Sequence, residues 1–365
     1  MRLYFYFAQR FAGSLFRLFL IFFVLTILLE MIEVLRKFDS SALGFLEILK
    51  LTALHAPRTI YNIVPLVVLL ATLTLFLSLA KSSELVIARA AGRSALRTLI
   101  SPIVVTLLLG ALVVGVFNPI VTATIKQYDI LETRYTKGVQ PVLSLGPDGL
   151  WLRQGSETGQ TVIHARRANS DGTELFEVTF FGSNASNLNS FRIEAESAQL
   201  MAGHWLAHNT KKWVFEAGEN SELDAVTTVQ LRIPTDLTGD QIRQGFGPPS
   251  SIAIWDLPAF IDRLKLAGFS TRSHEIQLQT QLALPFLLVT MVLIGAVFTM
   301  RHTRFGRTGI MVLLAVTMGF ALFFVRNLAS ILGENGQIPV LLAAWAPPSA
   351  GILLALGLLL HTEDG

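Results

Sequence analysis

The sequence has no cysteine, and only 15% of its 365 residues are charged. The absence of cysteine excludes disulfides, a thiolate nucleophile and any metal centre with thiolate ligands. The low charge, the 25 phenylalanines and a mean hydropathy of +0.54 make the chain too apolar for a soluble globular protein. Together they predict an integral membrane protein with one soluble insert.

Motifs for nucleotide hydrolysis and hydrolytic catalysis are also missing. The chain has no G-x-x-x-x-G-K-[ST] loop, so we expect it not to hydrolyse ATP itself. It has neither G-x-S-x-G nor H-E-x-x-H, and no acid pair in an enclosed catalytic context. His204 and His208 are four residues apart, but no acid lies near them, so surface residues are favoured over a metal site. We therefore expect neither an enzyme nor a bound cofactor.

Six apolar runs are long enough to cross a bilayer. A helix rises ~1.5 Å per residue, so about 20 residues cross a hydrocarbon core of ~30 Å. We expect the first run to be a span and not a cleaved signal, because no convincing cleavage site follows it. The predicted spans are Leu18–Leu35, Pro57–Ala80, Leu99–Val116, Leu278–Met300, Thr308–Leu328 and Pro339–Leu360.

A polar stretch, residues 81–97, separates the second and third predicted spans. Its single acid is Glu84, and its four bases are Lys81, Arg89, Arg93 and Arg97. An excess of bases on a short loop marks the cytoplasmic side, which places both chain ends inside and the long insert outside. We predict a short helix at about residues 82–92 that ends at Gly92. Glu84 either favours the start of this helix through the helix dipole or binds a basic side chain of a cytoplasmic partner.

The insert, residues 122–272, alternates short β-type runs with turn residues. This pattern predicts an antiparallel sandwich or jelly roll, with Trp151, Trp205 and Trp213 in its core. An amphipathic helix at about 256–268 follows, which we expect at the membrane surface. The predicted strands are Gly149–Gln154, Thr161–Arg167, Leu175–Phe181, Ser190–Ala195, His204–His208, Lys212–Ala217 and Ala225–Ile233. The insert and its flanks, residues 126–275, contain more acids than bases, so nucleic acid is not an expected partner.

Charged residues near the outer ends of spans are candidates for a lipid site. Glu30, Glu33 and Lys37 share one helical face, and Arg36 adjoins them. A charge at mid-bilayer costs at least ~2.5 kcal/mol, so these residues either pair with one another at the interface or contact an anionic lipid. Arg326 in the fifth span likewise either binds a ligand or extends to the interface.

Three sequence blocks together resemble one family of membrane transporters. They are SELVIARAAG at Ser83–Gly92, LPAFIDRLKLAG at Leu257–Gly268 and IPVLLAAWAPPS at Ile338–Ser349. With three spans on either side of a β domain, the whole chain resembles the lipopolysaccharide export permeases of the LptF and LptG type. Within that family it is more similar to the LptG branch.

The resemblance implies a function, partners and roles for particular residues. The chain would pair with an LptF-like sibling and an LptB-like ATPase dimer, and pass lipopolysaccharide to an LptC-like periplasmic protein. The segment after span two would be the coupling helix, with Glu84 facing the ATPase and its neighbours Ser83, Leu85, Arg89 and Gly92 in the same contact. Spans one and five would form lateral gates, which places Glu30, Glu33, Arg36, Lys37 and Arg326 near lipid A phosphates. The chain would reside in the bacterial inner membrane, with its β domain in the periplasm.

Two other classes of function are compatible with parts of the sequence. One is a membrane scaffold that recruits partners by strand addition to its β domain, without a transport cycle. The other is an intramembrane lipid enzyme, which the missing set of acid, base and nucleophile disfavours.

Overall fold

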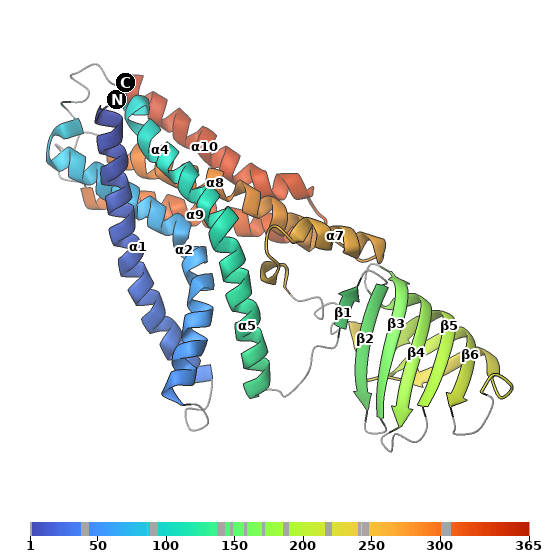
Figure 1. Ribbon diagram of the computed structural model, residues 1–365. Helices are drawn as coiled ribbons and strands as arrows, with labels where there is room; N and C mark the ends of the chain where they lie inside the picture. Colours follow the sequence, from blue (N-terminus) through green and yellow to red (C-terminus); the bar gives the residue numbers. More distant parts are fainter. Residues whose placement is uncertain are drawn as a thin grey trace. The chain divides into compact units, whose positions relative to one another are not determined.

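The computed structural model divides the chain into a helical unit and a β unit. It describes residues 2–37, 44–85, 87, 94–136, 143–146, 149–156, 159–169, 172–184, 190–215, 221–239, 242, 248–300 and 308–364. The helical unit contains residues 1–137, 250–255 and 275–365, and the β unit contains residues 138–249 and 256–274. Figure 1 shows both units, coloured along the sequence.

Six helices in the described part of the chain are long and apolar enough to cross a membrane, as the sequence predicted. The helix that contains the third span changes geometry midway, so it carries three labels. In Figure 1, α1 begins and α10 ends at the same end of the helical unit, which we call the terminal end. The opposite end, where α1 ends and α2 begins, is the insert end. The bounds are α1 Arg2–Lys37, α2 Phe45–Lys81, α4 Ala95–Leu112, the π-helix η1 Val113–Phe117, α5 Asn118–Thr136, α8 Arg272–Thr299, α9 Thr308–Glu334 and α10 Val340–Asp364.

The fourth span, α8, forms the centre of the helical unit. In its most apolar stretch of 18 residues, 78% of the residues are buried, whereas the corresponding shares are 17% in α1 and 11% in α9. Glycines let neighbouring backbones approach it closely, because helices in lipid associate through tight packing of small residues. A Cβ on Gly110 of α4 would lie 2.7 Å from Cα of Pro285, and one on Gly351 of α10 would lie 2.5 Å from a methyl of Thr290. The exposed apolar faces of α1 and α9 are left for lipid or for a partner.

The Gly110 contact predicts a clear stability difference between two glycine substitutions. We expect Gly110→Ala to lower the free energy of unfolding of the purified protein by about 1–3 kcal/mol. The added Cβ would collide with atoms that include the Pro285 backbone. Gly357→Ala in α10 is the matched control, since nothing lies within 4 Å of its added Cβ. Alanine favours a helix over glycine by about 1 kcal/mol, so the control should be neutral or stabilising. Equal melting temperatures for the two variants would contradict this packing.

The third span continues well beyond the predicted end of its helix. We predicted that the insert begins at residue 122, after Asn118-Pro119, but α5 continues to Thr136 and the β unit begins at residue 138. Proline has no N–H for the carbonyl four residues earlier, which here belongs to Gly115. The Trp255 indole donates to that carbonyl at 3.0 Å, while the helix widens into η1 with Asn118 N–H bonded to the Val113 carbonyl. The helix therefore continues past Pro119, and the Gly115 carbonyl still accepts a hydrogen bond.

The β unit contains an antiparallel sheet, and the predicted β insert is confirmed. Its described strands form one seven-stranded sheet in the order β1 to β7, and each strand pairs only with its neighbours in sequence. This simple up-and-down order differs from the crossed connections of a jelly roll, because connections of a few residues join only adjacent antiparallel strands. The strands are β1 Leu143–Gly146, β2 Gly149–Ser156, β3 Gly159–Ala168, β4 Glu174–Asn184, β5 Ser190–Met201, β6 His204–Phe215 and β7 Val226–Pro234.

Strand β6 replaces two strands that we predicted separately. The polar residues around Asn209 resemble a turn, but pairing with β5 continues on both sides, at His208 and at Thr210. Asn209 itself has φ of 50°, so a single residue in the left-handed region bends the strand without ending it. Strand β1 had no predicted counterpart.

The three tryptophans do not share one environment, contrary to our prediction. Trp205 is fully buried in the core of the β unit, whereas Trp151 is 38% exposed and Trp213 is half-buried. Trp205 and Ala207 are buried, but the alternation shifts by one residue at Asn209, so that Thr210 is buried and Trp213 lies with Lys211 on the other face. Trp213 there donates to Glu222 at 2.7 Å and contacts Lys211.

The amphipathic helix α7, Leu257–Leu266, packs against the β unit's own core. Leu264, Ala267 and Phe269 belong to the same buried cluster as Trp205. Gly268, with φ of +86°, ends the segment as predicted, and the Ala168 N–H donates to the Ala267 carbonyl at 2.7 Å. Leu264 therefore joins α7 to the core of the β unit, and the location of this helix at the membrane surface stays a prediction.

Candidate functional site

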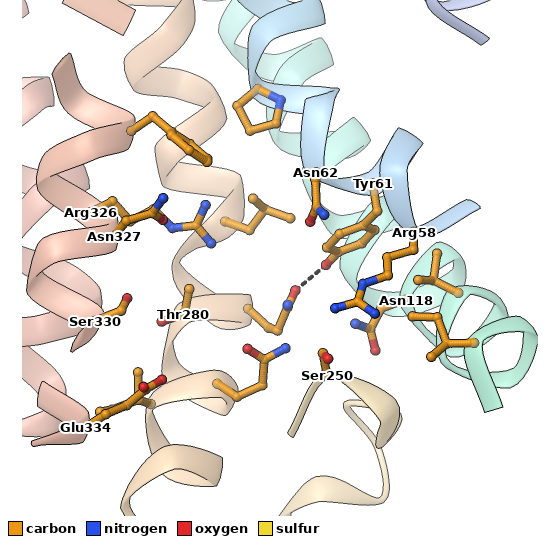
Figure 2. Close-up of a pocket in the computed structure, with 18 residues that line it drawn as sticks. Arg58, Tyr61, Asn62, Asn118, Ser250, Thr280, Arg326, Asn327, Ser330 and Glu334 are labelled. Atoms are coloured by element: carbon orange, nitrogen blue, oxygen red, sulfur yellow. Dashed lines mark hydrogen bonds between the residues drawn. The ribbon is translucent and has the colours of Figure 1, made fainter. Parts of the chain in front are cut away.

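A polar cavity lies within the helical unit, near its insert end. It has a volume of about 360 Å³ and is bounded by α2, α5, the segment around Ser250, α8 and α9. Two arginines reach it from opposite sides, Arg58 of α2 and Arg326 of α9 (Figure 2). Its other polar lining residues are Tyr61, Asn62, Asn118, Ser250, Gln277, Thr280, Gln281, Asn327, Ser330 and Glu334.

Within the described part of the chain, neither Arg58 nor Arg326 makes a salt bridge or a hydrogen bond. Glu334 lines the same cavity but is not within salt-bridge distance of either. A cation in a membrane-spanning helix normally pairs with an acid or lines a functional pathway. The cavity is thus electropositive and suited to an anion.

Polar groups around the arginines include one buried hydroxyl without a partner. The Tyr61 hydroxyl donates to the Gln281 side-chain oxygen, the bond drawn in Figure 2. Thr280, which directly precedes Gln281 in α8, is 8% exposed. Its hydroxyl makes no hydrogen bond within the described structure. A buried hydroxyl without a partner costs about 1–3 kcal/mol, which a ligand oxygen in the cavity would offset.

The structure gives Glu30, one of the predicted lipid contacts, an internal role. Its side chain is only 4% exposed, and it accepts hydrogen bonds from His55 Nδ1 at 2.5 Å and from the Thr59 hydroxyl. Both partners belong to α2, and the His55 ring packs on Tyr128 of α5. The expected pairing of Glu30 with Arg36 or Lys37 is not what the structure shows. Glu30 instead holds the insert end of α1 against α2.

The other predicted lipid contacts of α1, Lys37, Arg36 and Glu33, also lie outside the cavity. Lys37 forms a salt bridge of 2.7 Å to Glu132 of α5 and lies over the Tyr128 ring. Arg36 and Glu33 are exposed and make no salt bridge to the described residues. None of these residues lines the cavity that contains Arg326, so the structure does not unite the predicted lipid contacts in one site.

The His55–Glu30 contact predicts a stability effect that is specific to this pair. We expect His55→Ala to destabilise the protein by about 1–3 kcal/mol, because a buried carboxylate loses one of its two partners. Lys50→Ala, an exposed cation on the same helix, should be neutral. Replacing Glu30 and His55 together by apolar residues, as in Glu30→Met with His55→Leu, should recover the lost stability. Buried charged pairs can often be replaced together by apolar residues of similar size. Thermal unfolding in detergent measures all three; a His55→Ala curve that matches Lys50→Ala would contradict the contact.

Glu84 lies at the terminal end, just after α2, and bonds to α1. It accepts hydrogen bonds from the Tyr6 hydroxyl at 2.8 Å and from Ser82 at 2.8 Å, and Arg10 lies 3.3 Å away. Partial burial raises the pKa of the carboxyl, but the bonds from Tyr6 and Ser82 and the Arg10 charge outweigh it, so the net pKa lies below its usual range. The carboxylate is therefore ionised at neutral pH, and its contribution to stability is lost only as acid pH falls through this lowered pKa.

The rest of the predicted coupling residues are only partly within the described structure. Ser83 has φ of 59°, a left-handed conformation that turns the chain at the end of α2. Leu85 is 5% exposed and packs in the main helical core. Arg89 and Gly92 lie outside the described residues, as does most of the predicted helix at 82–92.

Sequence reasoning missed most of the cavity. Arg58 stands in one apolar segment and the adjacent Thr280 and Gln281 in another, and isolated polar residues in such segments carry no pattern. The available signal was that Arg58 begins span two, just as Arg326 ends span five, so both lie toward the outer end of the predicted topology. That coincidence indicates a shared depth in the bilayer.

The fold and the cavity define a multi-pass helical membrane protein with an inserted antiparallel β domain and a polar site between its helices. Sequence comparison then places it in a family. A model of the family "Lipopolysaccharide export system permease LptF/LptG" matches residues 5–361. The chain belongs to this family of transport permeases, which confirms the resemblance.

Individual relatives are similar over most of the chain. The lipopolysaccharide export system permease protein LptG of Haemophilus influenzae is 23% identical over 374 residues, which cover 98% of each chain. LptG of Escherichia coli K12 is 23% identical over 326 residues, 85% of this chain and 84% of the relative. These similarities support the predicted closeness to the LptG branch.

Proposed function

We propose that this chain is the LptG-like permease subunit of an ABC-type complex that extracts lipopolysaccharide from the inner membrane. The observation that carries the proposal is the electropositive cavity of Arg58 and Arg326 inside a membrane-spanning unit. A cation left unpaired among apolar helices is costly, and an anionic lipid headgroup is the ligand that would offset this cost. A volume of about 360 Å³ fits a phosphorylated sugar and not a whole glycolipid.

The energy for this transport comes from a separate ATPase in our proposal. The chain lacks a nucleotide-binding loop, and the polar segment after α2 is the expected docking surface. The basic residues there place it in the cytoplasm by the positive-inside rule, together with both chain ends. The β unit then lies in the periplasm, where it would pass lipid to an LptC-like protein.

Lipid contacts on the chain fall into two groups in this proposal. Arg326 with Arg58 binds phosphate in the cavity, and the exposed Arg36 with Glu33 meets the headgroup region at the insert end of α1. Glu30 and Lys37 instead hold α1 to its neighbours. The LptF-like sibling would cover the exposed apolar faces of α1 and α9.

The test is ATP turnover by the reconstituted complex of this chain, an LptF-like sibling and an LptB-like ATPase. In proteoliposomes, lipopolysaccharide should stimulate ATP hydrolysis, whereas an uncharged lipid of similar chain length should not. A scaffold that only recruits partners through its β domain would assemble with them but show no such stimulation. Assembly without lipopolysaccharide-dependent turnover would therefore favour the scaffold and refute transport.

A further inference from the structure

A cluster of side chains joins the terminal end of α1 to the segment that follows α2. The two oxygens of Glu84 are divided among three donors. Tyr6 donates to Oε2 at 2.8 Å, Ser82 donates to Oε1 at 2.8 Å, and an Arg10 Nη1 lies 3.3 Å from Oε1. The Arg10 guanidinium also lies 5.1 Å from the centre of the Tyr6 ring. We call Tyr6, Arg10 and Glu84 the α1 clasp.

The backbone around Glu84 holds its side chain in this position. The helix α2 ends at Lys81, and Ser83 in the left-handed conformation reverses the chain direction toward α1. Leu85 then inserts into the buried cluster that also contains Phe7 and Phe11 of α1. The segment of residues 82–85 is thus attached to α1 by a charged contact on one side and an apolar contact on the other.

Apolar side chains also hold this end of α1. Phe7 and Phe11 are 2% and 0% exposed and belong to the same buried cluster as Leu85. The charged contacts of α1 at its other end, Glu30 to His55 and Lys37 to Glu132, lie at least twenty residues away. A continuous helix of 36 residues is about 54 Å long, so α1 connects the two ends of the helical unit. A displacement of residues 82–85 therefore reaches α1 by two routes, the polar contacts of the clasp and the buried cluster that Leu85 shares with Phe7 and Phe11.

We propose that Tyr6 and Arg10 are positioning residues that transmit movement of the ATPase-docking segment to α1, the helix bordering the lipid path. This inference rests on the proposed function of the complex. The Glu84 side chain is 28% exposed, and a carboxylate accepts about four hydrogen bonds, so it has room for one more donor from a partner. The ATPase can thus engage Glu84 while α1 still holds it, and one carboxylate connects the two.

The test measures lipopolysaccharide transported per ATP hydrolysed by the full complex in proteoliposomes. Arg10→Ala should assemble and hydrolyse ATP, yet transport about fivefold to tenfold less lipid per ATP, as expected for loss of a charged contact. Tyr6→Phe removes one hydroxyl and should lower the ratio by about twofold to fivefold. Arg17→Ala is the matched control, since Arg17 lies two turns along α1 and, among the described residues, bonds to the Gly13 carbonyl of its own helix alone.

The possible outcomes separate this inference from the proposed function. A wild-type ratio in Arg10→Ala and Tyr6→Phe would overturn the clasp, as would an equal fall in Arg17→Ala. If Arg10→Ala lowers the yield of complex, the nearly isosteric Tyr6→Phe decides, because a merely structural role does not change lipid moved per ATP. A wild-type complex that never couples ATP hydrolysis to lipid movement would instead refute the proposed function.

Discussion

Glu84→Lys is expected to abolish lipopolysaccharide transport while the chain still folds and inserts. The substitution places a fifth base in residues 81–97 and turns the contact with Arg10 into a repulsion. It also removes the acceptor of Tyr6 and Ser82, and the carboxylate that we propose the ATPase engages. Losing a partly buried charged contact costs about 2–5 kcal/mol, which corresponds to a fall of more than about tenfold.

Three measurements on Glu84→Lys distinguish a specific effect from general damage. The variant should still unfold cooperatively, with a melting temperature lowered only by loss of the contacts to Tyr6, Ser82 and Arg10. Co-purification with the ATPase and lipid flux should both fall. Lys81→Glu is the control, since Lys81 is exposed and makes no salt bridge to the described residues. Wild-type complex yield and flux in Glu84→Lys would contradict the assigned role.

Arg326→Met is expected to change stability and transport in opposite directions. Removing an unpaired cation from a membrane-spanning helix relieves a cost of up to about 2.5–3.5 kcal/mol, so the melting temperature should not fall. Transport should fall by about tenfold or more, because the cavity loses half of its positive charge and a bidentate phosphate ligand. Arg326→Lys keeps the charge without the planar fork, and should be intermediate.

The comparison of folding with flux decides what Arg326 does. Melting temperature, complex yield and lipopolysaccharide flux should be measured for Arg326→Met beside Lys50→Met, which removes an exposed cation outside the cavity. Our account requires reduced flux with unreduced stability in the first variant and no change in the second. A lower melting temperature with normal flux in Arg326→Met would show that the arginine supports the fold and not a ligand.

The sequence predicts the membrane spans well, because the thickness of the bilayer sets the length of apolar sequence that a span needs. Apolar runs of sufficient length revealed all six spans, and turn residues revealed most strands. Errors arose where tertiary contacts compensate a local signal. Pro119 does not end its helix because Trp255, distant in sequence, takes the free carbonyl of Gly115. Asn209 does not end its strand because both neighbouring strands continue to pair around it.

The functional residues were predictable one at a time but not in their combinations. Glu84 and Arg326 stand out because each is an unusual charge in its segment. Their partners do not, since Tyr6, Arg58 and Thr280 are ordinary residues until packing brings them to the site. Glu30 illustrates the same limit: helical spacing pointed to Lys37 on its own helix, whereas its partner His55 lies on the next helix.

The most direct test of the central claim is ATP-driven removal of lipopolysaccharide from the membrane. Labelled lipopolysaccharide would be placed in proteoliposomes with this chain, its LptF-like sibling, the LptB-like ATPase and an LptC-like acceptor. Our account predicts that lipid leaves the vesicles only when ATP and all the subunits are present, and that Arg326→Met slows its departure. Release that continues without this chain, or no ATP-dependent release from the complete complex, would contradict it.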